Sequence, residues 1–414
     1  MRLLFHINRS IFLFIFLYIL LIIGFFFDEN SLGAAAQDYN HHLRIIYSFK
    51  NSIYESLKLY GSEDLYTRNS PFFFILYGTL LKIINNLDFL RFLNLNIILL
   101  NVFFFYKALK IKYYFVDSQI LFSLACLILL SPTYRSLSIW PYPLIYALLF
   151  FTIATYYYLK FNNEKKNQFK NACLNVLFVA LSSYFTPNFS VFSVFFLFKF
   201  LYKFKSSYKL YLLIFENIIL AIPALIFLTN KDLFFLRNEV EEFSFIDKIN
   251  IANKIAIIST IIFFHLFPFF ILNIKKIFLT ISNFLIIFLI FFFCIIFFDF
   301  STKYNVGGGI FFQASIFLFN NNFLFYIIFL ISLIFFGNLI KNSKQNLIIL
   351  LLLIPYNAQY SIYHKYFDYL ILIIFLLLLE NNIKKKQFNT RNLLFIYVFN
   401  LSFLIISLFK NFLR

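Results

Sequence analysis

Charged residues are scarce in this chain, at only 13% of its 414 residues. That is about half the share found in a soluble domain. Hydrophobic residues make up 62% of the chain, and the mean hydropathy is +0.83. So little charge excludes an ordinary soluble globule, whose surface needs many more charged side chains to stay in water. The chain is therefore expected to lie in lipid.

Cysteine is also rare, and Cys126, Cys173 and Cys294 all lie inside apolar runs. The sequence contains neither a C-x-x-C pair nor a cysteine–histidine cluster, the usual signatures of zinc and redox sites. We therefore expect the three cysteines to be packing residues. A single Met and a single Trp stand beside 68 Phe, a bias typical of AT-rich coding. We interpret the aromatic residues as lipid-facing bulk.

Long apolar runs are abundant, and those of about 18 or more residues are long enough to cross a bilayer. Short clusters of Lys and Arg separate the runs, as expected of loops that follow the positive-inside rule. The net charge of +18 is thus interpreted as loop charge and not as a nucleic-acid surface. The predicted fold is an all-α polytopic membrane protein, a single integral-membrane domain over residues 1–414. It would have about 13 transmembrane helices and amphipathic juxtamembrane helices on the outer face.

The orientation follows from the basic residues. Arg2 and Arg9 place the N-terminus inside, before an uncleaved first span, although "LGAAAQ" is a weak cleavage signal. Residues 28–70 then lie outside. The later Lys clusters alternate correctly only if one of the apolar segments 71–87, 92–107 and 117–131 does not cross. We assign 71–87 to the outer interface, because it begins with "RNSP" and ends with "NNLD". Most acidic residues then fall on the outer face.

The first outer segment carries an aspartate, Asp38, ahead of a helical pattern. Apolar residues recur with a roughly helical period over 41–60 and charged residues fill the gaps, which predicts an amphipathic helix on the membrane surface. Asp38 would either cap this helix at its N-terminus or act chemically. In the second case the carboxylate takes a proton from an acceptor hydroxyl at the bilayer edge, beside a lipid-linked donor.

Three further polar residues lie in the same outer segment. His41 and His42 either bind a metal ion or contact a polar or phosphate group. Adjacent helical residues point about 100° apart, so the two imidazoles are poorly placed to chelate one ion together. Arg68 precedes "NSP", where its guanidinium either pairs with phosphate oxygens or reaches the lipid headgroups by snorkelling.

Two later outer segments also hold candidates. "SPTYRSLSIWPYP" contains Arg135 among aromatic residues that either belong to the interfacial belt or stack on a sugar ring. "HKYFDYLILI" places Lys365, Tyr366 and Asp368 at the outer mouth of a late span predicted at 366–380. Lys365 either binds phosphate or pairs with Asp368 three residues on.

Two other features match no nucleotide-binding motif. The glycines of "KYNVGGGIFFQAS" lack the spacing of a phosphate-binding loop, and we expect a flexible outer loop or a re-entrant turn. Glu216 lies within an apolar run. It either snorkels, bonds across helices or marks the polar path of a transported solute.

The order of these segments resembles the GT-C superfamily of integral-membrane glycosyltransferases, such as the lipid A aminoarabinose transferases and protein mannosyltransferases. A first span precedes a long outer loop with an aspartate in "AAAQDYNHH". "RNSPFFFILYG", the charged turn "NNLDFLR" and a second outer loop follow. The resemblance covers residues 1–160, with the outer loop at 28–91. Residues 161–414 match as additional transmembrane helices.

The resemblance implies a donor sugar on polyprenyl phosphate and a lipid, glycan or protein acceptor. It places the catalytic carboxylate on Asp38 and implies inverting transfer at the outer face of a bacterial inner membrane. No divalent metal is expected, because the second outer loop has no acid and Gln37 stands beside Asp38. The residues implied to contact substrate, above all the lipid phosphate, are His41, His42, Arg68, Arg91, Arg135, Lys365 and Tyr366.

Two other functions remain open from the sequence. A transporter or flippase of a lipid-linked saccharide would use Glu216, Asn217 and a helix broken at Pro223 as a midplane site. A scaffold protein would need neither Glu216 nor Asp38.

Overall fold

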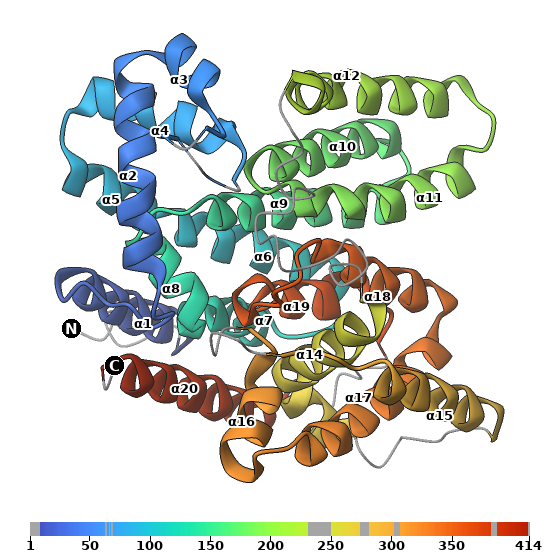
Figure 1. The fold of residues 1–414 in the computed structure, drawn as a ribbon. Coiled ribbons are helices and arrows are strands. Elements are labelled where there is room, and N and C mark those ends of the chain that lie inside the picture. Colours follow the sequence, from blue (N-terminus) through green and yellow to red (C-terminus); the bar gives the residue numbers. More distant parts are fainter. Residues whose placement is uncertain are drawn as a thin grey trace, which may run out of the picture. The chain divides into compact units, whose positions relative to one another are not determined.

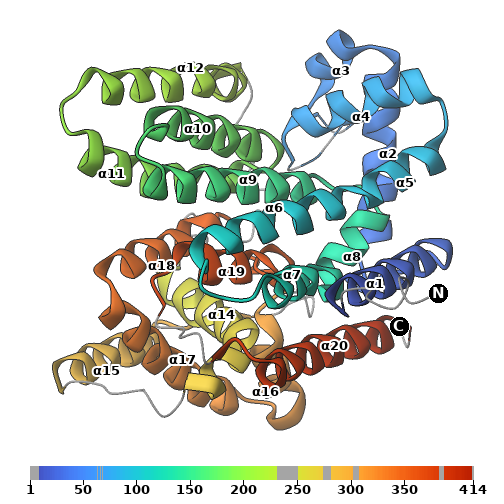
Figure 2. The ribbon, with the colours of Figure 1, turned by 180° about the vertical axis from the view of Figure 1, so that it is seen from behind.

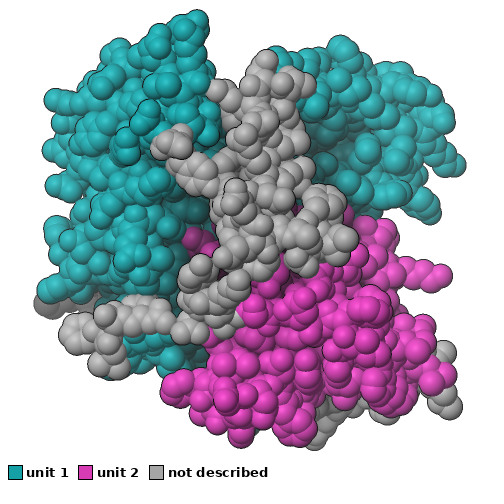
Figure 3. All heavy atoms as spheres, viewed as in Figure 1, with its two compact units in different colours: residues 1–234, 388–414 teal, residues 235–387 magenta. Residues whose placement is uncertain are grey.

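The fold is known from a computed structural model that describes residues 9–62, 64, 65, 67, 69–230, 250–273, 281–301, 307–381 and 387–412. Within these ranges every regular element is a helix, and one isolated bridge joins Tyr60 to Leu65. The chain divides into two compact units (Figure 3). Unit 1 comprises residues 1–234 and 388–414, and unit 2 comprises residues 235–387. Each unit is described by itself below.

Seven helices in the described ranges are long and apolar enough to cross a membrane. An eighth crossing is possible if two segments bent by 66°, Ser118–Leu130 and Pro132–Ile139, form one broken span. The described residues thus form an all-helical fold with several candidate membrane spans, as the composition predicts. The larger number of about 13 crossings stays a prediction. The seven helices are Arg9–Phe26, Leu87–Lys112, Pro143–Asn163, Tyr208–Ile226, Ile251–Leu272, Phe323–Lys341 and Thr390–Lys410.

Unit 1 contains most of the helices. In both ribbon views α9 lies beside α10, and α2 stands beside α4 (Figures 1 and 2). The elements are α1 (Arg9–Phe26), α2 (Ala35–Asn51), α3 (Ile53–Leu59), α4 (Pro71–Ile84), α5 (Leu87–Leu95), α6 (Ile97–Lys112), α7 (Ser118–Cys126), η1 (Leu127–Leu130), α8 (Pro132–Ile139), α9 (Pro143–Asn163), α10 (Gln168–Phe185), η2 (Pro187–Val191), α11 (Phe192–Phe204), α12 (Tyr208–Asn230) and α20 (Thr390–Phe412).

Two Ser-Pro pairs begin helices in unit 1. Ser70 accepts a hydrogen bond from the Phe72 amide at 3.3 Å at the start of α4, and Ser131 accepts one from the Tyr134 amide at 3.0 Å at the start of α8. A serine at the N-cap satisfies an amide that the helix itself cannot. Proline in the first turn costs the helix no hydrogen bond, because an amide at that position would have no partner within the helix. The sequence thus fixes where both helices begin.

Helix α4 has 14 residues, fewer than the about 20 needed to cross a bilayer. Its Gly78 allows a close approach to α2, since a Cβ there would lie 2.7 Å from Cβ of Phe49 and 2.8 Å from the Lys50 amide nitrogen. The assignment of residues 71–87 to the outer interface remains a prediction. Its close packing on α2 explains why glycine occupies position 78.

Helix α9 forms the core of unit 1 and is buried along most of its length between α6 and α10. Polar side chains tie α10 to it. Asn175 donates to the Ala154 carbonyl at 2.8 Å, and Ser182 donates to the Ala147 carbonyl at 2.7 Å. Small and polar residues of this kind hold helices together where no hydrophobic effect drives their association.

Unit 2 contains α14 (Ile251–Asn273), α15 (Ile281–Ile296), α16 (Gly309–Phe319), α17 (Phe323–Asn342), α18 (Lys344–Tyr356), η4 (His364–Tyr366), α19 (Leu370–Ile373) and the π-helix η5 (Ile374–Leu378). Gly307, Gly308 and Gly309 all have positive φ angles, between 75° and 88°, which only glycine adopts readily. A Cβ on Gly309 would lie 2.7 Å from Cγ1 of Ile261. The described part of the glycine segment is therefore a turn that docks α16 on α14. Residues 302–306 lie outside the described residues.

The late span predicted at 366–380 has a different form. After Tyr366, where η4 ends, only residues 370–378 are helical, first as a single α-turn and then as a π-helix, and all of them are buried. Asn346 fixes the end of this segment through two bonds with Glu380, one from its own Nδ2 to the Glu380 carbonyl (2.9 Å) and one from the Glu380 amide to its Oδ1 (2.8 Å). The segment is thus an internal part of unit 2 and not one of its long apolar helices.

Candidate functional site

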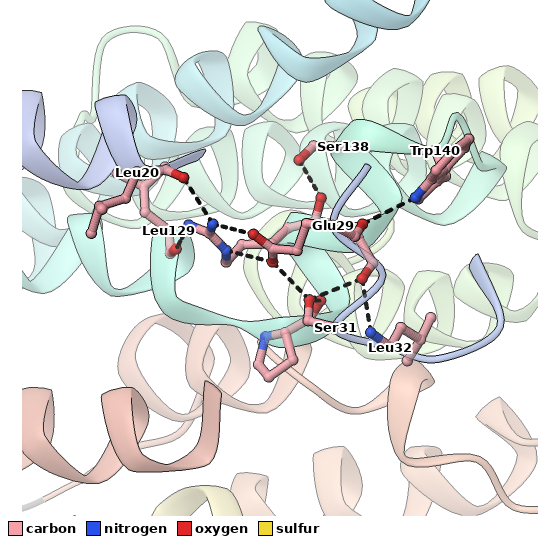
Figure 4. Close-up of polar contacts among 10 residues, drawn as sticks. Leu20, Glu29, Ser31, Leu32, Leu129, Ser138 and Trp140 are labelled. Atoms are coloured by element: carbon pink, nitrogen blue, oxygen red, sulfur yellow. Dashed lines mark hydrogen bonds and ion pairs between the residues drawn. The ribbon is translucent and has the colours of Figure 1, made fainter. Parts of the chain in front are cut away.

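The segment between α1 and α2 is held on α8 by a buried ion pair (Figure 4). Nε of Arg135 donates to Oε1 of Glu29 at 2.8 Å, and Nη2 of Arg135 bonds to Oε2 of the same carboxylate. The two side chains are only 5% and 8% exposed, for Arg135 and Glu29 respectively. A bidentate ion pair of this kind fixes the relative orientation of the two side chains as well as the distance between them. It therefore determines how the chain leaves the first span.

The remaining donors of Arg135 bind carbonyl groups. Nη1 donates to Leu129 at 3.3 Å and Nη2 donates to Leu20 at 3.1 Å. All three guanidinium nitrogens are thus engaged within unit 1. In this arrangement Arg135 anchors the segment after α1. The contact with a lipid phosphate implied for it by the family resemblance stays a prediction and would need these bonds to be exchanged.

Further bonds continue from the ion pair to the start of α2. Trp140 Nε1 donates to the Glu29 carbonyl at 3.0 Å, and the Leu32 amide donates to Oγ of Ser136 at 2.8 Å. Figure 4 shows Glu29, Ser31 and Trp140 grouped around this segment. Oγ of Ser31 lies 2.9 Å from Oγ of Ser136. The segment is therefore docked on α8 at several points, and α2 starts from a fixed position.

Asp38 lies one turn inside α2 and not before it. Ala34 occupies the N-cap, where no side-chain cap bond forms within the described residues, so the prediction that Asp38 caps the helix is wrong. The helix starts earlier than the sequence pattern indicates, and a break at Ser52 divides the predicted helix 41–60 into α2 and α3. The side chain of Asp38 is half-buried.

Tyr39 and Arg91 lie beside the start of α2. The ring of the buried Tyr39 lies 5.8 Å from that of Trp140. Burial raises the pKa of the Tyr39 hydroxyl, and the nearby positive charge of Arg91 partly opposes that rise. Arg91 itself, on α5, stacks over Trp140 at 4.1 Å and over Phe25 at 5.3 Å. Aromatic faces attract a guanidinium in this geometry, so Arg91 is held close to the start of α2.

Two exposed carboxylates pair with Arg91. Nη2 donates to Asp28 at 2.6 Å, and Nη1 lies 3.5 Å from Asp88. Asp28 is 61% exposed and Asp88 is 85% exposed, whereas Arg91 is 12% exposed. An ion pair with an exposed carboxylate contributes little free energy, because water screens the charges. The rings of Trp140 and Phe25 are therefore the firmer support of Arg91, and an incoming anion has to displace only the two exposed carboxylates.

The two adjacent histidines differ in their environment. His41 is exposed, whereas His42 is buried, stacked on Tyr142 at 5.2 Å and bonded through Nε2 to Asn69 at 3.0 Å. His42 thus packs in the interface between α2 and α4, and His41 faces outward. In the described part of the chain no group of three His, Cys, Asp or Glu side chains is arranged to hold a metal ion. Arg68 lies outside the described residues.

The last two sequence candidates belong to unit 2. Lys365 and Tyr366 lie in η4, both half-buried, and Nζ of Lys365 lies 5.8 Å from the centre of the Tyr366 ring. Asp38 belongs to unit 1, so the sequence candidates are divided between the two units.

Both units contain buried charged or ionisable residues that were not predicted from the sequence. The sequence around Glu29 does not indicate an ion pair, because its partner Arg135 follows more than a hundred residues later. His265 did carry a signal, since an ionisable residue inside an apolar span is a functional candidate by default. It lies in α14 near Asp368 and His364. Glu216, the one such residue considered from the sequence, bonds to the thiol of Cys173 in unit 1.

Comparisons with protein-family models, with curated proteins and with solved structures find no match to this chain.

Proposed function

We propose that the chain is a membrane glycosyltransferase of the GT-C type. It would transfer a sugar from polyprenyl phosphate to a lipid, glycan or protein acceptor, at the outer face of a bacterial inner membrane. One observation carries the proposal most directly. Asp38 lies in the first turn of a helix that the Glu29–Arg135 pair docks directly after the first apolar span. A half-buried carboxylate is thus held at the end of a long apolar helix, where a lipid-linked donor and a polar acceptor would meet.

The proposed reaction is a direct displacement. The acceptor hydroxyl loses its proton to the Asp38 carboxylate while its oxygen forms a bond to the anomeric carbon of the donor. The bond from that carbon to the phosphate oxygen breaks, and polyprenyl phosphate leaves with the electron pair. Attack from the face opposite the leaving group inverts the anomeric configuration.

A cation near the leaving phosphate would stabilise the charge that develops on it. Arg91 is the best supported candidate in unit 1, because its guanidinium is held beside Tyr39, the neighbour of Asp38. Its present partners, Asp28 and Asp88, are exposed and can be exchanged for a phosphate. Arg68 stays a second candidate on the family resemblance alone, and His41 is the outward-facing histidine of the pair.

The lipid tail of the donor would bind along the apolar surface of unit 1. Helix α1 exposes large side chains on one side, including Phe12, Phe16 and Phe26. A prenyl tail that moves from lipid onto this surface is already out of water, so it packs there by van der Waals contact and not by the hydrophobic effect. This arrangement favours donors that are already dissolved in the membrane.

The test is transfer of radiolabelled sugar from polyprenyl phosphate by the purified full-length chain, compared with Asp38→Asn. The substitution removes the proton acceptor and keeps the side-chain shape, so we expect transfer to fall by at least about a hundredfold. Asp64→Asn is the matched control, because Asp64 is 74% exposed and has no role in the proposal. Equal transfer by Asp38→Asn and wild type, with both proteins folded, would refute the proposed role of Asp38.

A transporter of a lipid-linked saccharide is the second candidate. One observation favours it, namely Glu216 within the candidate span Tyr208–Ile226, which also contains Pro223. A proline inside a helix removes a backbone bond and is common where transporters bind substrate. Glu216→Gln would abolish uptake into proteoliposomes if transport is the function, whereas the glycosyltransferase proposal expects it to leave sugar transfer unchanged.

A further inference from the structure

Two turns of unit 1 carry a large share of the positive charge of the chain. Residues 160–170, around the turn between α9 and α10, contain four lysines and one acid, Glu164. Residues 199–209, around the turn between α11 and α12, contain four lysines and no acid. Eight lysines and one glutamate give a net charge of +7, out of +18 for the whole chain. We call these two stretches together the basic end.

The fold brings the two turns together. The ring centre of Phe161, near the end of α9, lies 5.7 Å from that of Phe204, the last residue of α11. Phe169, in the first turn of α10, lies 6.3 Å from the same Phe204 ring. In both ribbon views the two turns lie at the same end of the helices α9 to α12 (Figures 1 and 2). Two lysine clusters that α10 separates in the sequence thus form one surface.

Most of this charge has no counter-charge within unit 1. Glu164, the only acid in the two stretches, is already paired with Lys160 at 3.2 Å. Among the residues that the structure describes, no carboxylate pairs with any of the five exposed lysines of the basic end. Like charges that gather in this way repel one another and attract anions from outside. The five are Lys165, Lys166, Lys170, Lys203 and Lys205.

Exposed aromatic side chains lie directly beside these lysines. Tyr202 is 88% exposed, Tyr208 is 68% exposed and Tyr211 is 61% exposed. Tyrosine is enriched where a membrane protein passes from lipid to water, because its ring is apolar and its hydroxyl is polar. The candidate span Tyr208–Ile226 also begins at the basic end. The lysines are therefore placed at the level of the lipid headgroups.

The two observations together favour an amphiphilic anion as the ligand. An acidic soluble protein would neutralise the lysines but would leave the neighbouring tyrosines without an apolar partner. An anionic phospholipid offers a phosphate to the lysines and acyl chains to the exposed apolar side chains that follow along α12, such as Phe215. The positive-inside rule assigns the basic end to the cytoplasmic side, and anionic lipids attract basic segments there.

We propose that the basic end is a binding site for the headgroups of anionic phospholipids and that its two turns bind them jointly. The ammonium groups would donate charge-assisted hydrogen bonds to the phosphate oxygens of the lipid. The site uses none of the residues of the proposed sugar transfer, and the inference does not depend on that function. It assigns a role to charge that the sequence alone explains only as a marker of orientation.

The test measures binding of radiolabelled phosphatidylglycerol to the purified full-length chain in a non-ionic detergent. Unlabelled phosphatidylglycerol should displace the label, whereas phosphatidylcholine with the same acyl chains and no net charge should not. Binding should also weaken as salt rises from 0.1 M to 1 M, because the screening length falls from about 10 Å to about 3 Å. Equal displacement by the two lipids, or binding that does not change with salt, would overturn the inference.

Paired variants test whether both turns contribute. Lys165→Gln/Lys166→Gln removes two charges from the first turn, and Lys203→Gln/Lys205→Gln removes two from the second. Each should weaken binding by about 25-fold, since each lysine near an anionic surface contributes about fivefold. Weakening by only one of the two variants would refute a joint site.

The matched control is Lys58→Gln/Lys82→Gln. It removes the same amount of charge from exposed positions on α3 and α4 and should bind phosphatidylglycerol like the wild type. If the control weakens binding as much as the variants of the basic end, net charge and not this surface attracts the lipid, and the inference fails.

Two further competitors identify the ligand class. Inorganic phosphate should not displace the label, and neither should a polyglutamate peptide. Displacement by inorganic phosphate at the same concentrations as phosphatidylglycerol would assign the site to the free ion. Displacement by the peptide would assign it to an acidic protein, and either result would overturn the lipid assignment. Asp38→Asn should bind phosphatidylglycerol like the wild type, so a failure of the proposed sugar transfer leaves this test intact.

Discussion

The guanidinium of Arg135 forms a bidentate ion pair with the carboxylate of Glu29, and both side chains are almost completely buried. This pair holds the segment after α1 against α8, and α2 with Asp38 starts from that segment. A salt bridge therefore fixes the position of the proposed catalytic carboxylate, although neither of its members needs to contact substrate.

Removing the Glu29 carboxylate should destabilise the fold strongly. Glu29→Ala leaves the Arg135 charge buried without its partner, which typically costs about 3–5 kcal/mol. The change in unfolding free energy would be measured by titrating the purified chain, held in a mild detergent, with a denaturing detergent. Asp64→Asn is the control, since its exposed pair with Arg44 contributes at most about 1 kcal/mol. Similar losses for the two variants would show that burial of the pair has no special effect.

Gly78→Ala should separate α4 from α2. A methyl group there meets the backbone of α2 at Lys50 and not a flexible side chain, so the helices have to shift. We expect a loss of about 1–3 kcal/mol in unfolding free energy, as for other overpacked sites. Thr79→Ala, on the exposed side of α4, should change stability by less than about 0.5 kcal/mol. A Gly78→Ala protein as stable as the Thr79→Ala control would contradict the close approach.

Tyr77→Phe tests the buried polar network of unit 1. The Tyr77 hydroxyl bonds to Oδ1 of Asn94 and to the Tyr146 hydroxyl, both at 2.7 Å. Removing it leaves Oδ1 of Asn94 buried with one donor fewer, which costs about 1–3 kcal/mol. Thermal unfolding compared with Tyr114→Phe gives the measurement, because Tyr114 is 83% exposed. A change no larger than that of the control would mean that water replaces the missing hydroxyl.

Arg91→Gln should weaken donor use if the proposed function is correct. The substitution removes the charge beside Tyr39, and a charge-assisted bond contributes about 1.5–3 kcal/mol, or about 10- to 100-fold in kcat/KM for the donor. Arg44→Gln, an exposed arginine of α2, is the matched control. Unchanged donor kinetics in Arg91→Gln, with sugar transfer otherwise intact, would remove Arg91 from the proposed phosphate contacts.

Local features were predictable where a short stretch of sequence decides the structure. Apolar runs predicted an all-helical fold, and the first of them forms a single helix, Arg9–Phe26, that is long and apolar enough to cross a membrane. The Ser-Pro pair in "RNSP" predicted the start of α4, whereas "SPTYRSLSIWPYP" was expected to be an outer loop and instead begins the buried helix α8. The start of α2 was misplaced because Ala35, Ala36 and Gln37 are good helix formers without a capping residue before them. The π-helix at Ile374–Leu378 could not be predicted, since its sequence of isoleucine, phenylalanine and leucine equally suits an ordinary span.

The candidate site was predictable only in part. Asp38 and Arg91 were singled out, and the structure shows what holds each in place. Their roles in the reaction stay predictions. The Glu29–Arg135 pair was not predictable, because one sequence contains no signal that links two charged residues so far apart. His265 was overlooked within an apolar helix, where only its later neighbours Asp368 and His364 reveal a cluster.

The pairing of Glu29 with Arg135 also sets an order of events during synthesis. The two residues are 106 positions apart, and a ribosome adds about 5–20 residues per second. For roughly 5 to 20 seconds after Glu29 is made, its partner Arg135 has not yet been made. The segment that carries Asp38 therefore stays undocked from α8 while the helices between them are made. A nascent chain arrested before Arg135 would hold every residue of α2 and still lack the contact that positions that helix.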